Sequence, residues 1–239
     1  MYSMISKFKP AVIIALGATA FATPSYAAGD ESSSDKWFVE GRYQKSISES
    51  DGFRDADTTA SKVVSSTGEE WSNLDSAGIS IGKYFNEGKS SLSLGYESFG
   101  TKDKKFATAT QQDGTVIRNV VLPMDITNIM IEFGYQVPIS QNLFAIGLVG
   151  VGQATIDSKT YSVAGTPGQG VAMEVTNTST RFGVGVGYKL SPSTSIIGLI
   201  QQSDYGDSTV DTDATTATID DFDSEVKATE ASIRLRVSF

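Results

Sequence analysis

The chain has 239 residues, of which 28 are acidic and 19 basic, so its formal charge at neutral pH is −9. This balance argues against a nucleic-acid partner, because phosphate binding requires a basic surface. The chain contains no His, which removes the usual general base for a nucleophilic Ser, and no Cys, which removes disulfides. We therefore expect neither an enzyme nor a cofactor.

The amino terminus has the organisation of a secretory signal peptide. Lys7 and Lys9 precede the apolar run 11–22, and Ser25-Tyr26-Ala27 supplies the small residues of a cleavage site. The apolar run is shorter than the roughly 20 residues that a membrane-spanning helix needs. We expect a signal peptide at 1–27 and a mature domain at 28–239. The alternative is an uncleaved amino-terminal membrane anchor.

Alternating apolar and polar residues predict β-strands along the rest of the chain. We expect eight of them, at 36–46, 74–85, 90–99, 124–137, 143–157, 178–190, 195–202 and 230–239. The face assignment of the strand at 143–157 stays open, because apolar residues occur on both faces. One set is Phe144, Ile146 and Leu148, and the other is Val149 and Val151. A bulge in this strand would reconcile them.

The connections between these strands alternate in length. Short turns at 86–89, 138–142 and 191–194 separate four long polar loops at 47–73, 100–123, 158–177 and 203–226. In the first turn Gly88 can supply the positive φ that a tight hairpin needs. An up-and-down barrel of the outer membrane has this asymmetry, with short periplasmic turns and long extracellular loops.

Aromatic residues gather at the strand ends next to the short turns. The expected girdle at that membrane interface consists of Trp37, Phe85, Tyr135, Phe144, Tyr188 and Phe239. The alternative is a soluble eight-stranded barrel, whose apolar residues would face inward. The signal peptide, the terminal Phe239 and the loop asymmetry favour the membrane barrel.

The last strand shows the clearest alternation, with Ile233, Leu235, Val237 and Phe239 on one face and Arg234 and Arg236 on the other. Together with residues 36–43 and the Gly-rich stretch 182–188, it carries a resemblance to the small eight-stranded outer-membrane barrels of the OmpA/OmpX/Opa-like group. The resemblance implies an all-β, transmembrane, antiparallel up-and-down barrel in the bacterial outer membrane. It also implies that Ile233, Leu235, Val237 and Phe239 form the signal read by the outer-membrane assembly machinery. We expect no peptidoglycan-binding domain of the kind that OmpA carries.

Sorting the strand faces places nine charged residues inside the barrel: Glu40, Arg42, Glu97, Glu132, Arg181, Lys189, Glu230, Arg234 and Arg236. An eight-stranded barrel is just wide enough for side chains to fill its interior. We therefore expect these charges to pair across the lumen and plug it. The alternative is a narrow porin-like channel for ions or small solutes, lined by the same residues.

The fourth loop is rich in acids, namely Asp204, Asp207, Asp211, Asp213, Asp220, Asp221, Asp223 and Glu225. Their spacing matches no calcium-binding loop and no acid–base pair, so we expect neither a metal site nor a carboxylate hydrolase. Divalent ions would still bridge them to anionic lipopolysaccharide. The expected protein is a monomeric surface or structural barrel whose loops meet lipopolysaccharide, a host or a partner cell.

Overall fold

The structure, a computed structural model, describes residues 36–50, 53–54, 63–67, 70–71, 74–111, 116–158, 161–163, 166–169, 173–210 and 222–239. The predicted signal peptide lies outside these residues, so its cleavage stays a prediction. Within the described ranges, no helix is long and apolar enough to cross a membrane.

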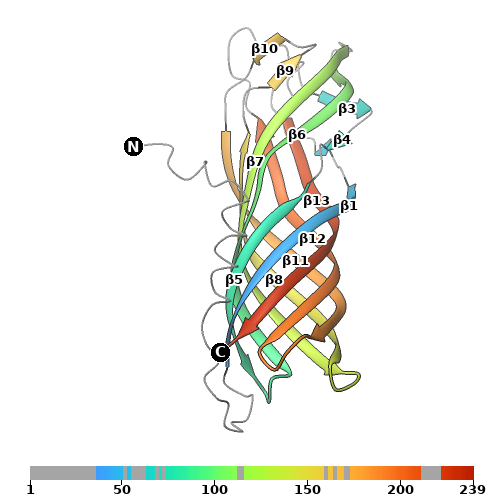
Figure 1. Ribbon diagram of the computed structural model, residues 1–239. Helices are drawn as coiled ribbons and strands as arrows, with labels where there is room; N and C mark the ends of the chain where they lie inside the picture. Colours follow the sequence, from blue (N-terminus) through green and yellow to red (C-terminus); the bar gives the residue numbers. More distant parts are fainter. Residues whose placement is uncertain are drawn as a thin grey trace.

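Eight long antiparallel strands close into a barrel (Figure 1), as the alternation predicted. They are β1 (Trp37–Ser50), β5 (Ser76–Phe85), β6 (Ser90–Gln111), β7 (Val116–Pro138), β8 (Leu143–Ser158), β11 (Met173–Lys189), β12 (Thr194–Val210) and β13 (Phe222–Ser238). Each strand pairs with its neighbours along the chain, and β13 returns to β1. The closing ladder reaches the last residue, since Trp37 N donates to Phe239 O at 3.2 Å and Phe239 N donates to Trp37 O at 2.9 Å. Closure removes the unpaired sheet edge that lipid would not tolerate.

The two ends of the barrel differ. One end, which we call the turn end, carries the short turns 86–89, 139–142 and 190–193. The opposite end, which we call the loop end, carries five shorter strands: β2 (Phe53–Arg54), β3 (Val63–Thr67), β4 (Glu70–Trp71), β9 (Tyr161–Val163) and β10 (Thr166–Gln169). These strands join the same sheet as the barrel through pairs with β13, β6, β7 and one another.

The barrel strands extend further at the loop end than the sequence pattern predicted. β6 and β7 remain paired from Ser90↔Tyr135 to Thr110↔Val116, so most of the loop expected at 100–123 is a hairpin. Likewise β12 and β13 pair as far as Val210↔Phe222. The hydropathy pattern predicted strand ends that came too early. Once two antiparallel strands are aligned, their hydrogen bonds need only backbone groups, so the pairing continues into polar sequence.

In the first short turn, Gly88 has the positive φ that the sequence predicted, and the two residues before it share this conformation. Gly88 has a φ of 78°, but Asn86 and Glu87 also adopt positive φ values of 54° and 57°. Lys89 N donates to Asn86 O at 3.0 Å and closes the turn. Three successive left-handed residues therefore reverse the chain at this point.

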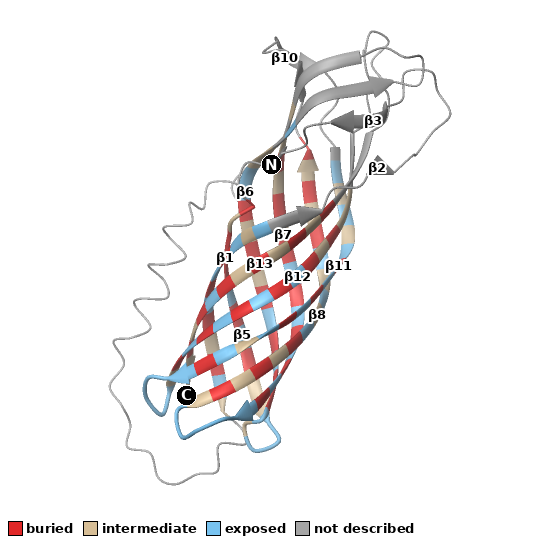
Figure 2. Cartoon of the chain, turned by 90° about the vertical axis from the view of Figure 1, so that its right-hand side faces the viewer, coloured by how far each residue is buried: buried red, intermediate tan, exposed pale blue. Residues whose placement is uncertain are grey.

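Buried and exposed residues alternate along the barrel strands (Figure 2), and the exposed outer face is largely apolar while the buried inner face carries the charged residues. On β13, Ile233 is 60% exposed, whereas its neighbours Arg234 and Ser232 are both 2% exposed. The ambiguous strand β8 also alternates, but its inward face is apolar, with Phe144, Ile146 and Leu148 buried and Val149 and Val151 exposed. Its register with β7 and β11 is continuous, so the bulge proposed for it was wrong.

Five of the six residues of the expected aromatic girdle face outward at the turn end: Trp37, Phe85, Tyr135, Tyr188 and Phe239. The exception is Phe144, which is only 4% exposed. An ideal Cβ on Gly187 would collide with the Phe144 ring, so this ring occupies the space that Gly187 leaves open inside the barrel. Assigning Phe144 to the membrane interface was therefore an error that followed from the ambiguous pattern of β8.

Candidate functional site

Eight charged side chains fill the middle of the lumen: Glu40, Arg42, Glu97, Glu132, Arg181, Glu230, Arg234 and Arg236. We call them the lumen network. They come from β1, β6, β7, β11 and β13, and none is more than 4% exposed. Four carboxylates face four guanidinium groups, so the formal charge of the network is zero. Charges buried at this depth are tolerated only when they are paired and hydrogen-bonded.

Two arginines clamp two glutamates at the centre of the network. Arg42 Nη1 lies 2.9 Å from both Glu97 Oε1 and Glu132 Oε2. Arg181 binds Glu97 with both terminal nitrogens, at 2.6 Å to Oε1 and 2.7 Å to Oε2, and contacts Glu132 Oε1 at 3.1 Å. A forked guanidinium suits such bidentate contacts.

A second branch runs from the centre toward the turn end. Arg234 Nη1 contacts Glu132 Oε2 at 2.9 Å and Glu40 Oε1 at 3.1 Å. Glu40 also accepts from Arg236, whose Nη2 lies 2.7 Å from Oε2. The Arg236 guanidinium lies 4.2 Å above the centre of the Phe38 ring, which adds a cation–π contact.

A third branch holds Glu230 by neutral donors. Ser203 Oγ and Gln201 Nε2 donate to Glu230 Oε2 at 2.7 and 2.9 Å, and the Tyr205 hydroxyl donates to Oε1 at 2.9 Å. Arg181 Nη2 approaches Glu230 only to 4.0 Å. Gln44 accepts from Gln201 and so attaches this branch to β1.

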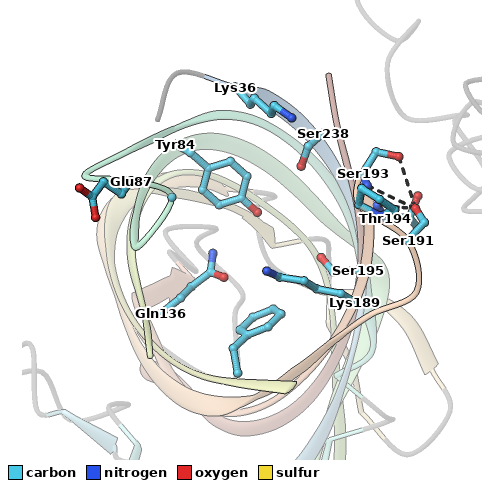
Figure 3. Close-up of a pocket in the computed structure, with 13 residues that line it drawn as sticks. Lys36, Tyr84, Glu87, Gln136, Lys189, Ser191, Ser193, Thr194, Ser195 and Ser238 are labelled. Atoms are coloured by element: carbon cyan, nitrogen blue, oxygen red, sulfur yellow. Dashed lines mark hydrogen bonds between the residues drawn. The ribbon is translucent and has the colours of Figure 1, made fainter. Parts of the chain in front are cut away.

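Lys189 was expected in this network but does not join it. It lies at the end of β11 and is exposed, while the inward residues Arg181 and Gly187 on the same strand are buried. Figure 3 shows its side chain extending across the mouth of the barrel at the turn end. Strand alternation assigned Lys189 to the correct face but could not give its position along the barrel axis. Lys189 is the last residue of β11, where the interior of the barrel opens to water.

Apolar side chains lie on both sides of the network. Toward the turn end, β8 and β12 supply a buried cluster of Phe144, Ile146, Leu148, Ile197 and Leu199. Toward the loop end the buried residues include Phe99, Met124, Ile126, Ile156 and Tyr205. Phe99 packs edge-on against Tyr205 at a centroid distance of 5.0 Å. Apolar groups therefore lie next to the network in both directions along the barrel, and toward the turn end Arg236 also contacts the Tyr84 hydroxyl.

Sequence reasoning missed the uncharged members of this site. Tyr205 is completely buried, and Gln201 and Ser203 are each 1% exposed. Their signal was the odd-numbered face of β12, which continues beyond the predicted strand end at residue 202 through Ser203 to Tyr205. Extending the predicted strand by three residues would have placed Ser203 and Tyr205 in the lumen.

The acidic fourth loop is only partly described. The side chains of Asp211, Asp213, Asp220, Asp221, Asp223 and Glu225 lie outside what the structure describes. Of the two other acids, Asp204 pairs with Lys227 at 3.4 Å. Among the described side chains, no group of three or more His, Cys, Asp or Glu is arranged to hold a metal ion.

Several solved structures are similar to this chain. OprG, an outer membrane protein from Pseudomonas aeruginosa, is similar with a TM-score of 0.52 at 9% identity, over 86% of this chain and 96% of that chain. Neisserial surface protein A gives 0.49 at 13% identity, over 85% and 97%. The Yersinia pestis attachment invasion locus protein Ail, solved with the heparin analogue sucrose octasulfate, gives 0.38 at 11% identity, over 84% and 99%.

No curated protein matches the chain. The family described as the outer membrane protein beta-barrel domain matches residues 13–239, which is nearly the whole sequence. This match agrees with the closed eight-stranded barrel, whose outer face is apolar and whose interior carries the charged residues. The chain therefore belongs to the outer membrane protein beta-barrel domain family.

Proposed function

We propose that this protein is a non-conducting barrel of the outer membrane that displays its loop end on the cell surface, where it contacts lipopolysaccharide, a host or a partner cell. The observation that carries the first part is the lumen network, in which four carboxylates and four guanidinium groups pair inside the barrel. The proposal assigns no catalytic role to any residue.

The network supports a plug for an energetic reason. A permeating ion would have to displace side chains that already neutralise one another, and an uncompensated buried charge costs about 3–5 kcal/mol. The apolar residues on either side add a second barrier, because Phe99 and Phe144, for example, offer an ion no polar partner.

The experiment that tests the plug is planar-bilayer recording from purified monomer. We expect no steady conductance above the bilayer background. A matched variant, Glu132→Ala with Arg234→Ala, removes one acid and one base and so keeps the charge balance while it empties space. If the unmodified protein already conducts steadily, the porin-like alternative replaces the plug.

The loop end supports a surface role. Long connections emerge from one end, and the family places such connections outside the cell. In this chain the β6–β7 hairpin projects well past β1 (Figure 1). Loops and hairpins on a rigid barrel commonly carry recognition.

Shortening the β6–β7 hairpin tests this role. Lys105 pairs with Val121, so an Asn-Gly turn in place of residues 106–120 would close the hairpin at that pair. We expect the shortened protein to insert and to keep the heat resistance of a folded barrel, while adherence of cells that display it falls. Unchanged adherence after all four connections are shortened would leave only a structural role.

The outward residues of the last strand suit the proposed assembly signal. Ile233 and Phe239 are 60% and 69% exposed, and Leu235 and Val237 share their face. A Phe239→Ser variant is expected to assemble poorly in cells yet fold normally in detergent. Equal assembly in cells would remove this role.

A further inference from the structure

A cavity of about 150 Å³ opens at the turn end of the barrel, below the lumen network. Its walls include Lys36, just before β1, and residues from five strands, namely Tyr84, Gln136, Phe144, Lys189 and Ser195. Figure 3 shows Lys189 and Gln136 extending toward one another from opposite walls, with the Tyr84 ring beside them. The plug proposed above does not involve this cavity.

The walls of the cavity include groups that contact the interior of the barrel. Phe144, at 4% exposure, belongs to the buried cluster on β8 and β12 and forms an apolar wall. The Tyr84 hydroxyl accepts from Arg236 Nη1 at 3.1 Å, and Arg236 is neutralised by Glu40. The cavity is therefore a recess with an apolar wall at Phe144 and a polar wall at Tyr84, whose hydroxyl is hydrogen-bonded to the lumen network.

The polar groups of this recess favour an anion. Lys36 and Lys189 supply two ammonium groups, and no ion pair joins either to another residue in the described part of the chain. Among the described residues that line the recess, Glu87 is the one acid; its Oε2 lies 3.5 Å from the Lys89 ammonium, and its side chain is 79% exposed. The recess thus carries positive charge in a protein whose overall charge is −9.

Gln136 provides the second, independent observation. The residue is only 9% exposed, and its side-chain nitrogen Nε2 has no hydrogen-bond partner among the described residues. A buried donor without an acceptor is uncommon in folded proteins, because leaving it unsatisfied costs about 1–3 kcal/mol. A carboxylate held between this amide and the Lys189 ammonium would satisfy both.

We propose that the turn-end recess binds a small organic carboxylate with an apolar body. Lys189 pairs with the carboxylate, the Gln136 amide donates to it, and the body packs against Phe144. A cavity of this volume holds a ring of the size of benzene. Benzoate is therefore a suitable probe. The proposal does not depend on surface adhesion, since it concerns the opposite end of the barrel.

The test is a titration of isotopically labelled protein in lipid nanodiscs with sodium benzoate, followed by NMR shifts around Gln136 and Lys189. Benzamide, which has the same shape but no charge, controls for partition into lipid. We expect saturable binding of benzoate that is about tenfold tighter than that of benzamide. Equal affinities for the two, or shifts that do not saturate, would overturn the proposal.

Two lysine variants complete the test. Lys189→Met keeps the side-chain length and lies at an exposed position, so it should fold. Lys83→Met is the control, because Lys83 lies on β5 at the same end but does not line the recess. We expect Lys189→Met to weaken benzoate about tenfold and Lys83→Met to leave it within about twofold. Equal effects of the two variants, or displacement of benzoate by equimolar inorganic phosphate, would rule out the carboxylate recess.

Discussion

Arg181 and Tyr205 meet at the loop-end side of the lumen network, where Arg181 Nη2 donates to the Tyr205 hydroxyl oxygen at 3.0 Å. The same hydroxyl donates to Glu230 Oε1 at 2.9 Å. Because Arg181 itself comes no closer than 4.0 Å to Glu230, the phenol bridges this acid to the arginine. Tyr205 is thereby the last member of the network toward the loop end, where the Phe99 ring packs against it.

Tyr205→Phe removes this bridge without changing the packing of the ring. We expect the free energy of unfolding to fall by about 1–3 kcal/mol, because the buried Glu230 loses a donor. Urea unfolding in lipid vesicles measures it. Tyr43→Phe is the matched control, since Tyr43 donates to Asp75 at 3.0 Å on the exposed outer face and should change stability far less. Similar losses in the two variants would contradict the bridging role.

Arg181→Met should destabilise the barrel more than Tyr205→Phe does, because it removes a buried charge as well as several hydrogen bonds. It leaves Glu97 with fewer charged partners and removes the nearest cation from Glu230, so we expect a loss of about 3–5 kcal/mol. Lys189→Met, the matched control on the same strand, should cost less than about 1 kcal/mol because Lys189 is exposed. Equal costs would place Lys189 in the network after all.

The coupling within the network can be measured separately. Adding Glu97→Gln to Arg181→Met removes both members of the bidentate pair, and the double variant should be more stable than the sum of the single losses predicts. Strict additivity of the two losses would mean that this pair does not hold the lumen together.

Gly185→Ala tests how tightly β11 and β12 approach inside the barrel. A Cβ at Gly185 would collide with the backbone carbonyl oxygen of Gly198, which no side-chain rotation can relieve. We expect a loss of about 1–3 kcal/mol in unfolding free energy. Gly41→Ala is the control, because nothing lies within 4 Å of the corresponding position on β1. A tolerated Gly185→Ala would show that the two strands can separate.

Trp37 should report the membrane interface at the turn end. The chain has two tryptophans, so Trp71→Phe leaves Trp37, which is 48% exposed on the outer face, as the only indole emitter. Lipids brominated near the headgroup should quench its fluorescence more than lipids brominated near the end of the acyl chain. The reverse order would place Trp37 deep in the bilayer, and no quenching by either lipid would contradict a lipid-facing position.

The larger part of the fold was accessible from the sequence, because strand alternation is a local property. Successive side chains in a strand point to opposite faces, so the residues Ile233 and Arg234 had to lie on different sides of the sheet. Where glycines interrupted this pattern, as around Gly147 in β8, the faces could not be read. The structure decided them, and with them the inward position of Phe144.

The candidate site was accessible only as a set of residues. Alternation put Glu132 and Arg234 inside, but these residues are 102 positions apart, and their 2.9 Å contact depends on the stagger of strands around the barrel. The sequence pattern also missed Tyr205, which lies beyond the predicted end of its strand. For Lys189 it gave the face of the strand but not the position along the barrel axis.

The sequence by itself determined the existence of eight strands, the faces of seven of them and the charged character of the lumen, because each follows from the period of two along a single strand. Only the tertiary structure decided which acid meets which base, how far the hairpins extend and where the lumen opens to water. These depend on the register between strands that are distant in the chain, which no local pattern encodes.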